Sequence, residues 1–309
     1  MLKKAISLEQ LIGALSEQYR VLGNKKRWVR SVYPIKQSEE DSLCFCVLKD
    51  ERAFELIRNS RSGVIICSDK LNFPEETYSD KTLIQVSNPR LTFSRLLRSY
   101  FFDKPQSGIH PTAIVDKRAK IGDRVCIGPL CNIENCEIGN DTILESGVHM
   151  LSKVKIGKRV RILPGAVIGP ESQGYERNEK MELERFPQLG GVVIEDDVWI
   201  GTNSIICRGA LPRSDTTIGK GTSIGAMVTV AHGVKIGNHC IIIAGCNILG
   251  SVQIGDYTHI SANVSIKQGV KIGNRVLVGL SSAVLSDIPD NVVVVGIPAK
   301  KIRDNIIVS

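Results

Sequence analysis

The chain has 309 residues and is 42% apolar and 23% charged, which is enough apolar material for two ordinary domains and excludes a disordered chain. No apolar run is long enough to span a membrane, and the first residues lack the apolar core of a signal peptide, so we expect a cytoplasmic protein. A net charge of +8 favours an anionic partner such as a nucleotide, coenzyme A or an acidic carrier protein. Basic and aromatic residues do not interleave, which argues against nucleic acid.

The first hundred residues show strand and helix patterns in alternation. Ser7 to Gln10 matches a capping box at the start of a helix. Strands are predicted over residues 29–35, 43–48, 63–68 and 82–87, and further helices over residues 51–59 and 91–102. This alternation predicts a small α/β domain over residues 1–105.

An aliphatic residue recurs every six positions through the second part of the chain. The unbroken series is Ile218, Ile224, Val230, Ile236, Ile242, Ile248, Ile254, Ile260, Ile266, Ile272, Val278 and Val284. The period predicts a solenoid with three flat sides, in which each hexad forms one side and its aliphatic residue stacks in the core. Glycine recurs after several of these aliphatic residues, and Gly is expected to supply the positive φ angles that the corners require.

The residue four places after each aliphatic one is small or β-branched, and it is predicted to point inward at a corner. Cys131, Cys240 and Cys246 occupy this position, so we expect the cysteines to be reduced, buried thiols that pack as small apolar residues. Residues 169–191 break the six-residue register and are predicted to leave the coil as a surface loop.

The hexads resemble those of the bacterial hexapeptide-repeat acyltransferases. The resemblance implies a mainly β fold, with a left-handed parallel β-helix over residues 106–290 behind the small α/β domain, and a homotrimer. Gly108 to Ala113, Phe186 to Ile194 and Cys207 to Leu211 are similar to the UDP-3-O-acylglucosamine N-acyltransferases of lipid A synthesis, which take their acyl group from acyl carrier protein.

The C-terminal residues resemble a different branch of these enzymes. Ser286 to Asn291 and Gly296 to Lys300 are similar to sugar acetyltransferases that use acetyl-CoA, and the chain ends without the helical extension that the lipid A enzymes carry. We therefore expect an N-acyltransferase that moves a short acyl group from acyl-CoA to a dTDP- or UDP-linked amino sugar for cell-surface polysaccharide. The alternative is lipid A N-acylation from acyl carrier protein.

The resemblance also implies the catalytic residues. Amine attack on a thioester needs a base and a donor for the oxyanion, and His232 in the segment Val230 to Ile236 matches the family's catalytic histidine. Gly250, eighteen residues later, is expected to lie beside it and to donate its backbone N–H to the oxyanion. The acidic partners that the family places near this histidine are replaced here by Gly225 and Gly233.

Other expected contacts are less closely tied to motifs. Phe45 matches an aromatic residue near the family's uracil pocket, so residues 1–105 are expected to bind the nucleotide sugar. Tyr175 and Phe186 are candidates for packing on the sugar or acyl chain. In the C-terminal tail, residues 291–309, the basic residues Lys300, Lys301 and Arg303 are candidates for the phosphates of CoA.

Two hypotheses other than sugar acyl transfer stay open. The γ-class carbonic anhydrases hold zinc on the same kind of helix through three histidines, for which His232, His239 and His259 are the candidates. Their spacing does not match that family, so we expect no metal. The second hypothesis is a non-catalytic β-helical scaffold.

Overall fold

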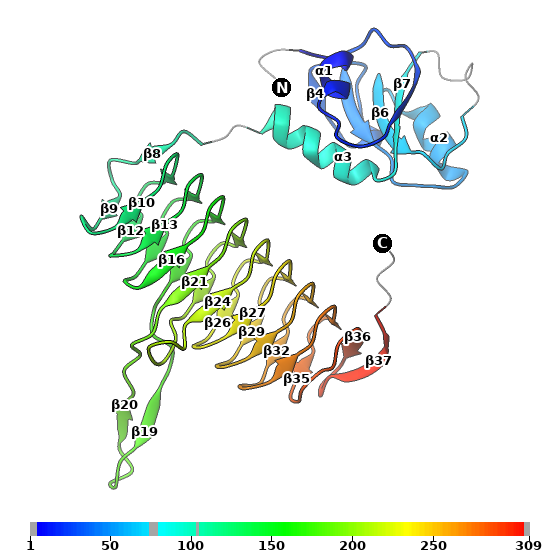
Figure 1. Ribbon diagram of the computed structural model, residues 1–309. Coiled ribbons are helices and arrows are strands. Elements are labelled where there is room, and N and C mark those ends of the chain that lie inside the picture. Colours follow the sequence, from blue (N-terminus) through cyan, green and yellow to red (C-terminus); the bar gives the residue numbers. More distant parts are fainter. Residues whose placement is uncertain (1–4, 74–79, 103–104, 306–309) are drawn as a thin grey trace. The chain divides into compact units, whose positions relative to one another are not determined.

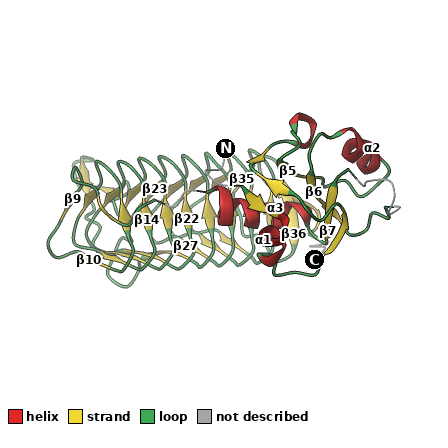
Figure 2. Cartoon of the chain, turned by 90° about the horizontal axis from the view of Figure 1, so that it is seen from above, coloured by secondary structure: helices red, strands yellow, loops and turns green. Residues whose placement is uncertain are grey.

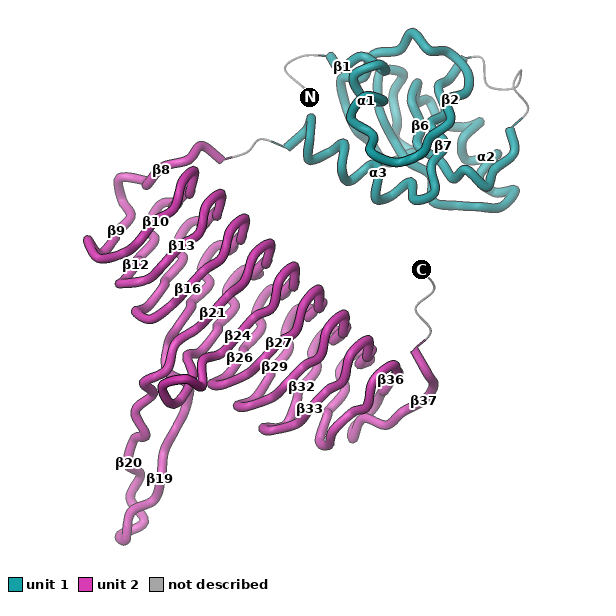
Figure 3. The backbone as a smooth tube through the Cα atoms, viewed as in Figure 1, with its two compact units in different colours: residues 1–104 teal, residues 105–309 magenta. Residues whose placement is uncertain are grey.

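A computed structural model describes residues 5–73, 80–102 and 105–305 (Figure 1). The chain divides into two compact units, Met1–Lys104 and Pro105–Ser309 (Figure 3). Within the described residues, no helix has the length and apolar character that a membrane span requires.

Unit 1 is a five-stranded sheet covered by helices, as the alternation predicts. The strands, in spatial order, are β2 (Arg20–Gly23), β7 (Thr82–Val86), β6 (Val64–Ser68), β5 (Ser42–Phe45) and β4 (Ser31–Val32), of which β2 alone runs antiparallel to its neighbour. The helices are α1 (Leu8–Gly13), α2 (Arg52–Asn59) and α3 (Pro89–Leu96), with a 3-10 turn at Ile35–Gln37 and a π-helical turn at Leu97–Phe101 after α3. The capping box of α1 is present, because the Gln10 N–H donates to the Ser7 hydroxyl and the Ser7 N–H donates to the Gln10 side chain.

The prediction of a single strand over residues 29–35 is wrong. Residues 28–29 form β3 (Trp28–Val29), which pairs antiparallel with β1 (Ile6–Ser7), whereas β4 pairs with β5 in the main sheet. Pro34 then caps the 3-10 turn. One apolar run therefore contributes strands to two different sheets. Strand β2 was not expected, because it is a short edge strand in which only Leu22 is buried.

Unit 2 is a parallel β-helix whose coils stack along one axis (Figure 2). Its three sides are named here face 1, face 2 and face 3. Face 1 contains β8 (Gly108–Ile109), β11 (Cys126–Ile127), β14 (Ile143–Leu144), β17 (Arg161–Ile162), β22 (Trp199–Ile200), β25 (Ser223–Ile224), β28 (Ile241–Ile242), β31 (His259–Ile260), β34 (Leu277–Val278), β36 (Val292–Val295) and β37 (Lys300–Asp304). Face 2 contains β9 (Ile114–Val115), β12 (Asn132–Ile133), β15 (His149–Met150), β18 (Val167–Ile168), β23 (Ile205–Ile206), β26 (Thr229–Val230), β29 (Asn247–Ile248), β32 (Ser265–Ile266) and β35 (Ala283–Val284). Face 3 contains β10 (Lys120–Ile121), β13 (Glu137–Ile138), β16 (Val154–Ile156), β21 (Val192–Ile194), β24 (Thr216–Ile218), β27 (Lys235–Ile236), β30 (Gln253–Ile254) and β33 (Lys271–Ile272).

The hexad pattern places the residues as predicted. Each aliphatic residue from Ile218 to Val284 is buried in one continuous core. The small position four residues later is buried as well, and Cys131, Cys240 and Cys246 fill it. These thiols are therefore part of the packing of the solenoid, as the sequence predicts.

The glycines supply the positive φ angles of the corners only in part. Gly219, Gly237 and Gly255 do not have positive φ angles; an added Cβ at Gly237 would lie 2.4 Å from Asp256 Oδ1 and 2.8 Å from Asp256 N. These glycines are needed because the next coil approaches too closely for a side chain. Positive φ occurs two residues further along the chain, at Gly221 as predicted but also at His239 and Tyr257.

An Asn/Asp ladder joins successive coils at the corner between faces 3 and 1. Asn238 Oδ1 accepts from the Lys220 N–H at 3.0 Å, Asp256 Oδ1 accepts from the Asn238 N–H at 2.7 Å, and Asn274 Oδ1 accepts from the Asp256 N–H at 2.9 Å. Each side chain thus provides an acceptor for a turn N–H of the preceding coil.

Residues 169–191 leave the solenoid as a β-hairpin. Its strands are β19 (Tyr175–Arg177) and β20 (Leu183–Arg185), and the hairpin projects away from the coils in Figure 1. At the other end of unit 2, Gly296 to Lys300 form the turn between β36 and β37, which close face 1.

Candidate active site

The irregular parts of the solenoid share one corner, the one between faces 2 and 3. The hairpin begins after Ile168 and ends before Val192, and residues 207–215 form a longer turn at the same corner of the next coil. Ile168 pairs with Ile206 and Ile206 with Val230, so the corner that follows Val230 continues this column. His232 lies in that third corner.

The structure brings His232 and Gly250 together. Val230 pairs with Ile248, so these two residues occupy equivalent places on consecutive coils. A Cβ added to Gly250 would lie 2.5 Å from His232 Nε2 and 2.6 Å from Cε1. The imidazole therefore occupies the space that a side chain at position 250 would take, and it is only partly buried.

The backbone N–H of Gly250 lacks a protein acceptor. The neighbouring Leu249 and Ser251 N–H groups donate to Ile266 O and His232 O, and the Gly250 carbonyl accepts from the Gly269 N–H. Among the described residues, the Gly250 N–H itself donates no hydrogen bond. An unpaired donor beside an imidazole is the arrangement that stabilises an oxyanion during acyl transfer.

No carboxylate hydrogen-bonds to His232 within the described part of the chain, which agrees with glycine at positions 225 and 233. Asp215 lies one coil away, in register with Gly233, and its Oδ1 accepts from the Gly191 N–H at 2.7 Å. Arg208 stands beside His232 on the preceding coil and directs its guanidinium to the carbonyl groups of Gly169 and Ser152. Arg208 and Asp215 were not singled out from the sequence, because their roles depend on contacts between distant coils.

The other expected contact residues lie at separate places. Tyr175 is the first residue of β19 and Phe186 follows β20, and both aromatic side chains are exposed on the hairpin. Phe45 in unit 1 is half-buried, and its ring packs on Phe93 with centroids 4.6 Å apart.

Lys300, Lys301 and Arg303 lie on β37 with exposed side chains, and Lys301 Nζ pairs with Asp304 Oδ1 at 2.7 Å. They are thus grouped at the end of face 1 rather than at the corner of His232.

The three zinc candidates do not converge within the chain. His239 stacks on Tyr257 at the corner between faces 3 and 1, with ring centroids 5.5 Å apart. His259 points outward from face 1, and burial lowers its pKa. Over the described ranges, no three His, Cys, Asp or Glu side chains are grouped as a metal site. Cys207 lies at the corner of His232, but burial raises the pKa of its thiol to about 11, so it is a poor nucleophile.

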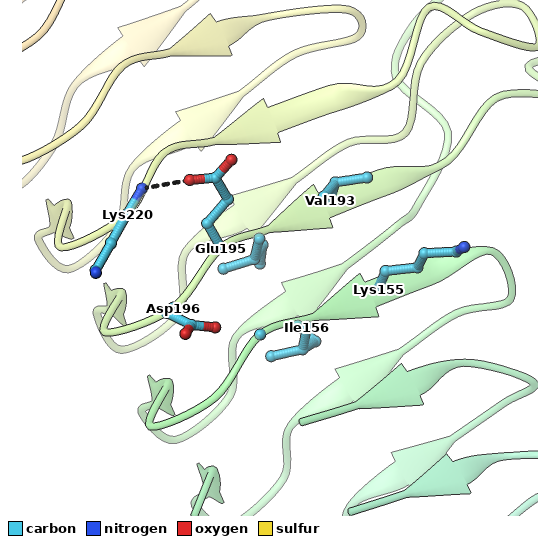
Figure 4. Close-up of a pocket in the computed structure, with 8 residues that line it drawn as sticks. Lys155, Ile156, Val193, Glu195, Asp196 and Lys220 are labelled. Carbon is cyan, nitrogen blue, oxygen red and sulfur yellow. Dashed lines mark hydrogen bonds between the residues drawn. The ribbon is translucent and has the colours of Figure 1, made fainter. Parts of the chain in front are cut away.

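The described hollows lie away from His232, and two of them are shown by their lining residues. The hollow in Figure 4 is on face 3 and is lined by Lys155, Glu195, Asp196 and Lys220, where the Lys220 N–H donates to Glu195 at 3.0 Å. A second hollow, in unit 1, lies at the carboxyl ends of β6 and β7 and is lined in part by Arg20, Asp69 and Gln85. Neither contains a motif that the sequence could have revealed.

Comparison with known proteins identifies the family. The model named bacterial transferase hexapeptide (six repeats) matches residues 135–170. UDP-3-O-acylglucosamine N-acyltransferase from Coxiella burnetii is 33% identical over 252 residues, covering 74% of this chain and 70% of that protein, and the enzyme of that name from Pseudomonas syringae is 31% identical with 68% of its length covered. Among solved structures, the UDP-N-acetylglucosamine acyltransferase from Bacteroides fragilis has a TM-score of 0.57 at 30% identity, covering 63% of this chain and 73% of that one. The UDP-N-acetylglucosamine O-acyltransferase from Moraxella catarrhalis has a TM-score of 0.59 at 30% identity, covering 64% of this chain and 74% of that one.

These relatives correct the expected donor and pathway. The expectation of a short acyl-CoA donor in cell-surface polysaccharide synthesis is wrong, because the matched relatives are named UDP-3-O-acylglucosamine N-acyltransferases, the family that the sequence resemblance associates with lipid A synthesis and acyl carrier protein. The acceptor in their name is itself a UDP-linked amino sugar. That expectation relied on Ser286 to Asn291 and on Gly296 to Lys300, and the second of these segments forms the turn that links the last two strands. The chain is a hexapeptide-repeat acyltransferase with a left-handed β-helix, and it belongs to the UDP-3-O-acylglucosamine N-acyltransferase family.

Proposed function

We propose that the protein transfers an acyl group from acyl carrier protein to the amine of UDP-3-O-acylglucosamine, with His232 as general base. The observation that carries the proposal is that the His232 imidazole lies next to Gly250, whose N–H donates no hydrogen bond, at one corner of an acyltransferase fold. The acceptor is taken from the name of the relatives that match 74% of the chain.

The two residues account for the chemistry of amide formation. The amine attacks the thioester carbonyl and passes a proton to the His232 imidazole, which raises the nucleophilicity of the nitrogen. The Gly250 N–H donates to the oxyanion of the tetrahedral intermediate. The intermediate collapses to the amide and expels the thiolate, which takes the proton from the imidazolium. A carboxylate that would hold the imidazole in place is absent from its described hydrogen-bond partners, so the packing of the ring against Gly250 is proposed to orient it.

The donor protein is proposed to approach through electrostatic attraction. The chain has a net charge of +8, and Lys300, Lys301 and Arg303 present basic groups on the last strand. An acidic carrier protein matches this charge. Unit 1, including Phe45, is proposed to bind the nucleotide part of the acceptor, and the exposed rings of Tyr175 and Phe186 to contact its sugar or acyl chain.

The surface pattern of the solenoid supports a homotrimer. The positive-φ column at the corner between faces 1 and 2 is uncharged along its whole described length: Leu130, Gly147, Gly165, Asn203, Met227, Gly245, Asn263 and Ser281. The equivalent column between faces 3 and 1 contains Arg124, Asp141, Arg159 and Asp197. Face 1 also exposes Trp199 and Ile241, and face 2 exposes Ile205. We propose that faces 1 and 2 pack against neighbouring copies, which would place His232 at the rim of each interface.

Mass spectrometry of the reaction products tests the assignment. Purified protein is incubated with acyl-loaded carrier protein and UDP-3-O-acylglucosamine, and with UDP-N-acetylglucosamine as a matched acceptor that has no free amine. We expect an added acyl group on the first acceptor only. Acylation of the second acceptor at a hydroxyl, or of neither, would contradict N-acyl transfer.

A further inference from the structure

The hairpin formed by β19 and β20 is fixed to the coils through its base. An isolated two-stranded hairpin is only marginally stable in water, so its position depends on what holds its two ends. The first end is residues 169–172 and the second is residues 186–191. Both hydrogen-bond to residues 208–215, the turn that directly precedes the corner of His232.

Arg208 holds the first end of the hairpin. Its Nε donates to Gly169 O at 2.6 Å, its backbone N–H donates to Pro170 O at 2.9 Å, and its Nη2 donates to Ser152 O at 3.3 Å. One arginine thus joins the start of the hairpin to the coils on both sides. Its planar guanidinium donates to two carbonyl oxygens from Nε and Nη2 in a fixed geometry, which the single ammonium nitrogen of lysine does not reproduce.

The second end is held by a buried glutamine and an aspartate. Gln188 is only 3% exposed; its Oε1 accepts from the Ser172 N–H at 2.9 Å and its Nε2 donates to Ser172 Oγ at 2.7 Å, which ties the two ends together. Asp215 accepts from the Gly191 N–H, and the Leu189 N–H donates to Ala210 O at 2.9 Å.

We propose that Arg208 is a positioning residue for the acceptor substrate. It occupies the place of His232 on the preceding coil, and its side chain fixes the hairpin that carries Tyr175 and Phe186. Arg208 therefore sets where these aromatic side chains stand relative to the base. This inference rests on the proposed function, because it takes Tyr175 and Phe186 as contacts of the acceptor.

Kinetics of Arg208→Ala with each substrate varied in turn test the proposal. We expect KM for the acceptor to rise on the order of tenfold, with kcat and KM for the donor within about twofold of wild type, because binding is impaired and the base is intact. The pH profile of kcat should keep its midpoint. Arg208→Lys should recover part of the acceptor affinity, because an ammonium group can still donate to Gly169 O.

Limited trypsin digestion gives a readout that does not require activity. Arg177, Lys180 and Arg185 are cleavage sites in the exposed hairpin. Arg208→Ala should be cut there several times faster than wild type while the coils stay intact. If the wild type acylates no acceptor but Arg208→Ala still loosens the hairpin, the proposed function fails and the anchoring holds.

Arg159→Ala is the matched control. Arg159 also joins consecutive coils, through Asp197 at 2.6 and 2.8 Å, but it lies at the corner between faces 3 and 1. The Arg159→Ala variant should have the acceptor KM and the trypsin pattern of wild type. The proposal is overturned if Arg208→Ala has a wild-type acceptor KM, if both variants change it equally, or if Arg208→Ala and Tyr175→Ala raise KM additively in a double-mutant cycle.

Discussion

The imidazole of His232 lies where the side chain of residue 250 would stand if that residue were not glycine. Because an added Cβ would lie only 2.5 Å from Nε2, a side chain at position 250 would displace the imidazole. The sequence could indicate His232 and Gly250 only through the resemblance of one short segment and an interval of one coil. The unpaired N–H of Gly250 could not be foreseen, because it depends on the conformation of the turn.

Replacing Gly250 with alanine should displace the imidazole and block the N–H beside it. We expect kcat to fall about 10²- to 10³-fold, the usual effect of losing one oxyanion donor, with little change in the thermal midpoint. The comparison is Ser251→Ala at the neighbouring exposed residue, which should keep wild-type kcat. A Gly250→Ala enzyme with normal kcat would remove this residue from the site.

The nine cysteines are packing residues in both units. Eight are buried and Cys126 is partly exposed; burial raises the pKa of Cys67 and Cys136 to about 12 each. Because the thiolate is the reactive form, we expect an aromatic disulfide reagent at pH 8 to modify at most about one thiol per native chain, and all nine after denaturation. Rapid modification of several native thiols would contradict this packing.

At the scale of elements, the period of six was enough to predict the solenoid, because an inward aliphatic residue in every hexad leaves few other folds. The period could not predict the structure of the segment that interrupts it. Residues 169–191 were expected as a plain loop, but they form a hairpin whose ends are set by distant residues such as Arg208. In unit 1, residues 29–35 were predicted as one strand, but residues 28–29 and 31–32 belong to two different sheets, since apolar content alone does not reveal strand partners.

The Asn/Asp ladder should contribute measurably to the stability of the solenoid. Asp256→Ala leaves the Asn238 N–H without its acceptor, and we expect the free energy of unfolding to fall by about 1 kcal/mol in a urea titration. Asp256→Asn keeps an Oδ1 acceptor at the same place and should lose much less. Equal losses in the two variants would mean that the charge of Asp256, and not its hydrogen bond, matters.

At the scale of the whole molecule, the uncharged corner and the exposed apolar residues of faces 1 and 2 form the interface proposed for the trimer. Ile241 points outward from face 1 and is 43% exposed. Ile241→Glu would bury a charge in the proposed interface, so light scattering should show a species of 33.8 kDa in place of one three times larger. Lys235→Glu on face 3 should remain trimeric. A wild-type monomer, or a trimeric Ile241→Glu variant, would contradict this assembly.

The rate of acyl transfer from acyl carrier protein to UDP-3-O-acylglucosamine, measured for wild type and His232→Ala under saturating substrates, tests the proposed reaction and its site together. The proposed mechanism predicts turnover by the wild type and a loss of about 10²- to 10⁴-fold in the variant, the usual effect of removing a general base. Turnover that survives in His232→Ala, or a wild type inactive with this pair of substrates, would contradict it.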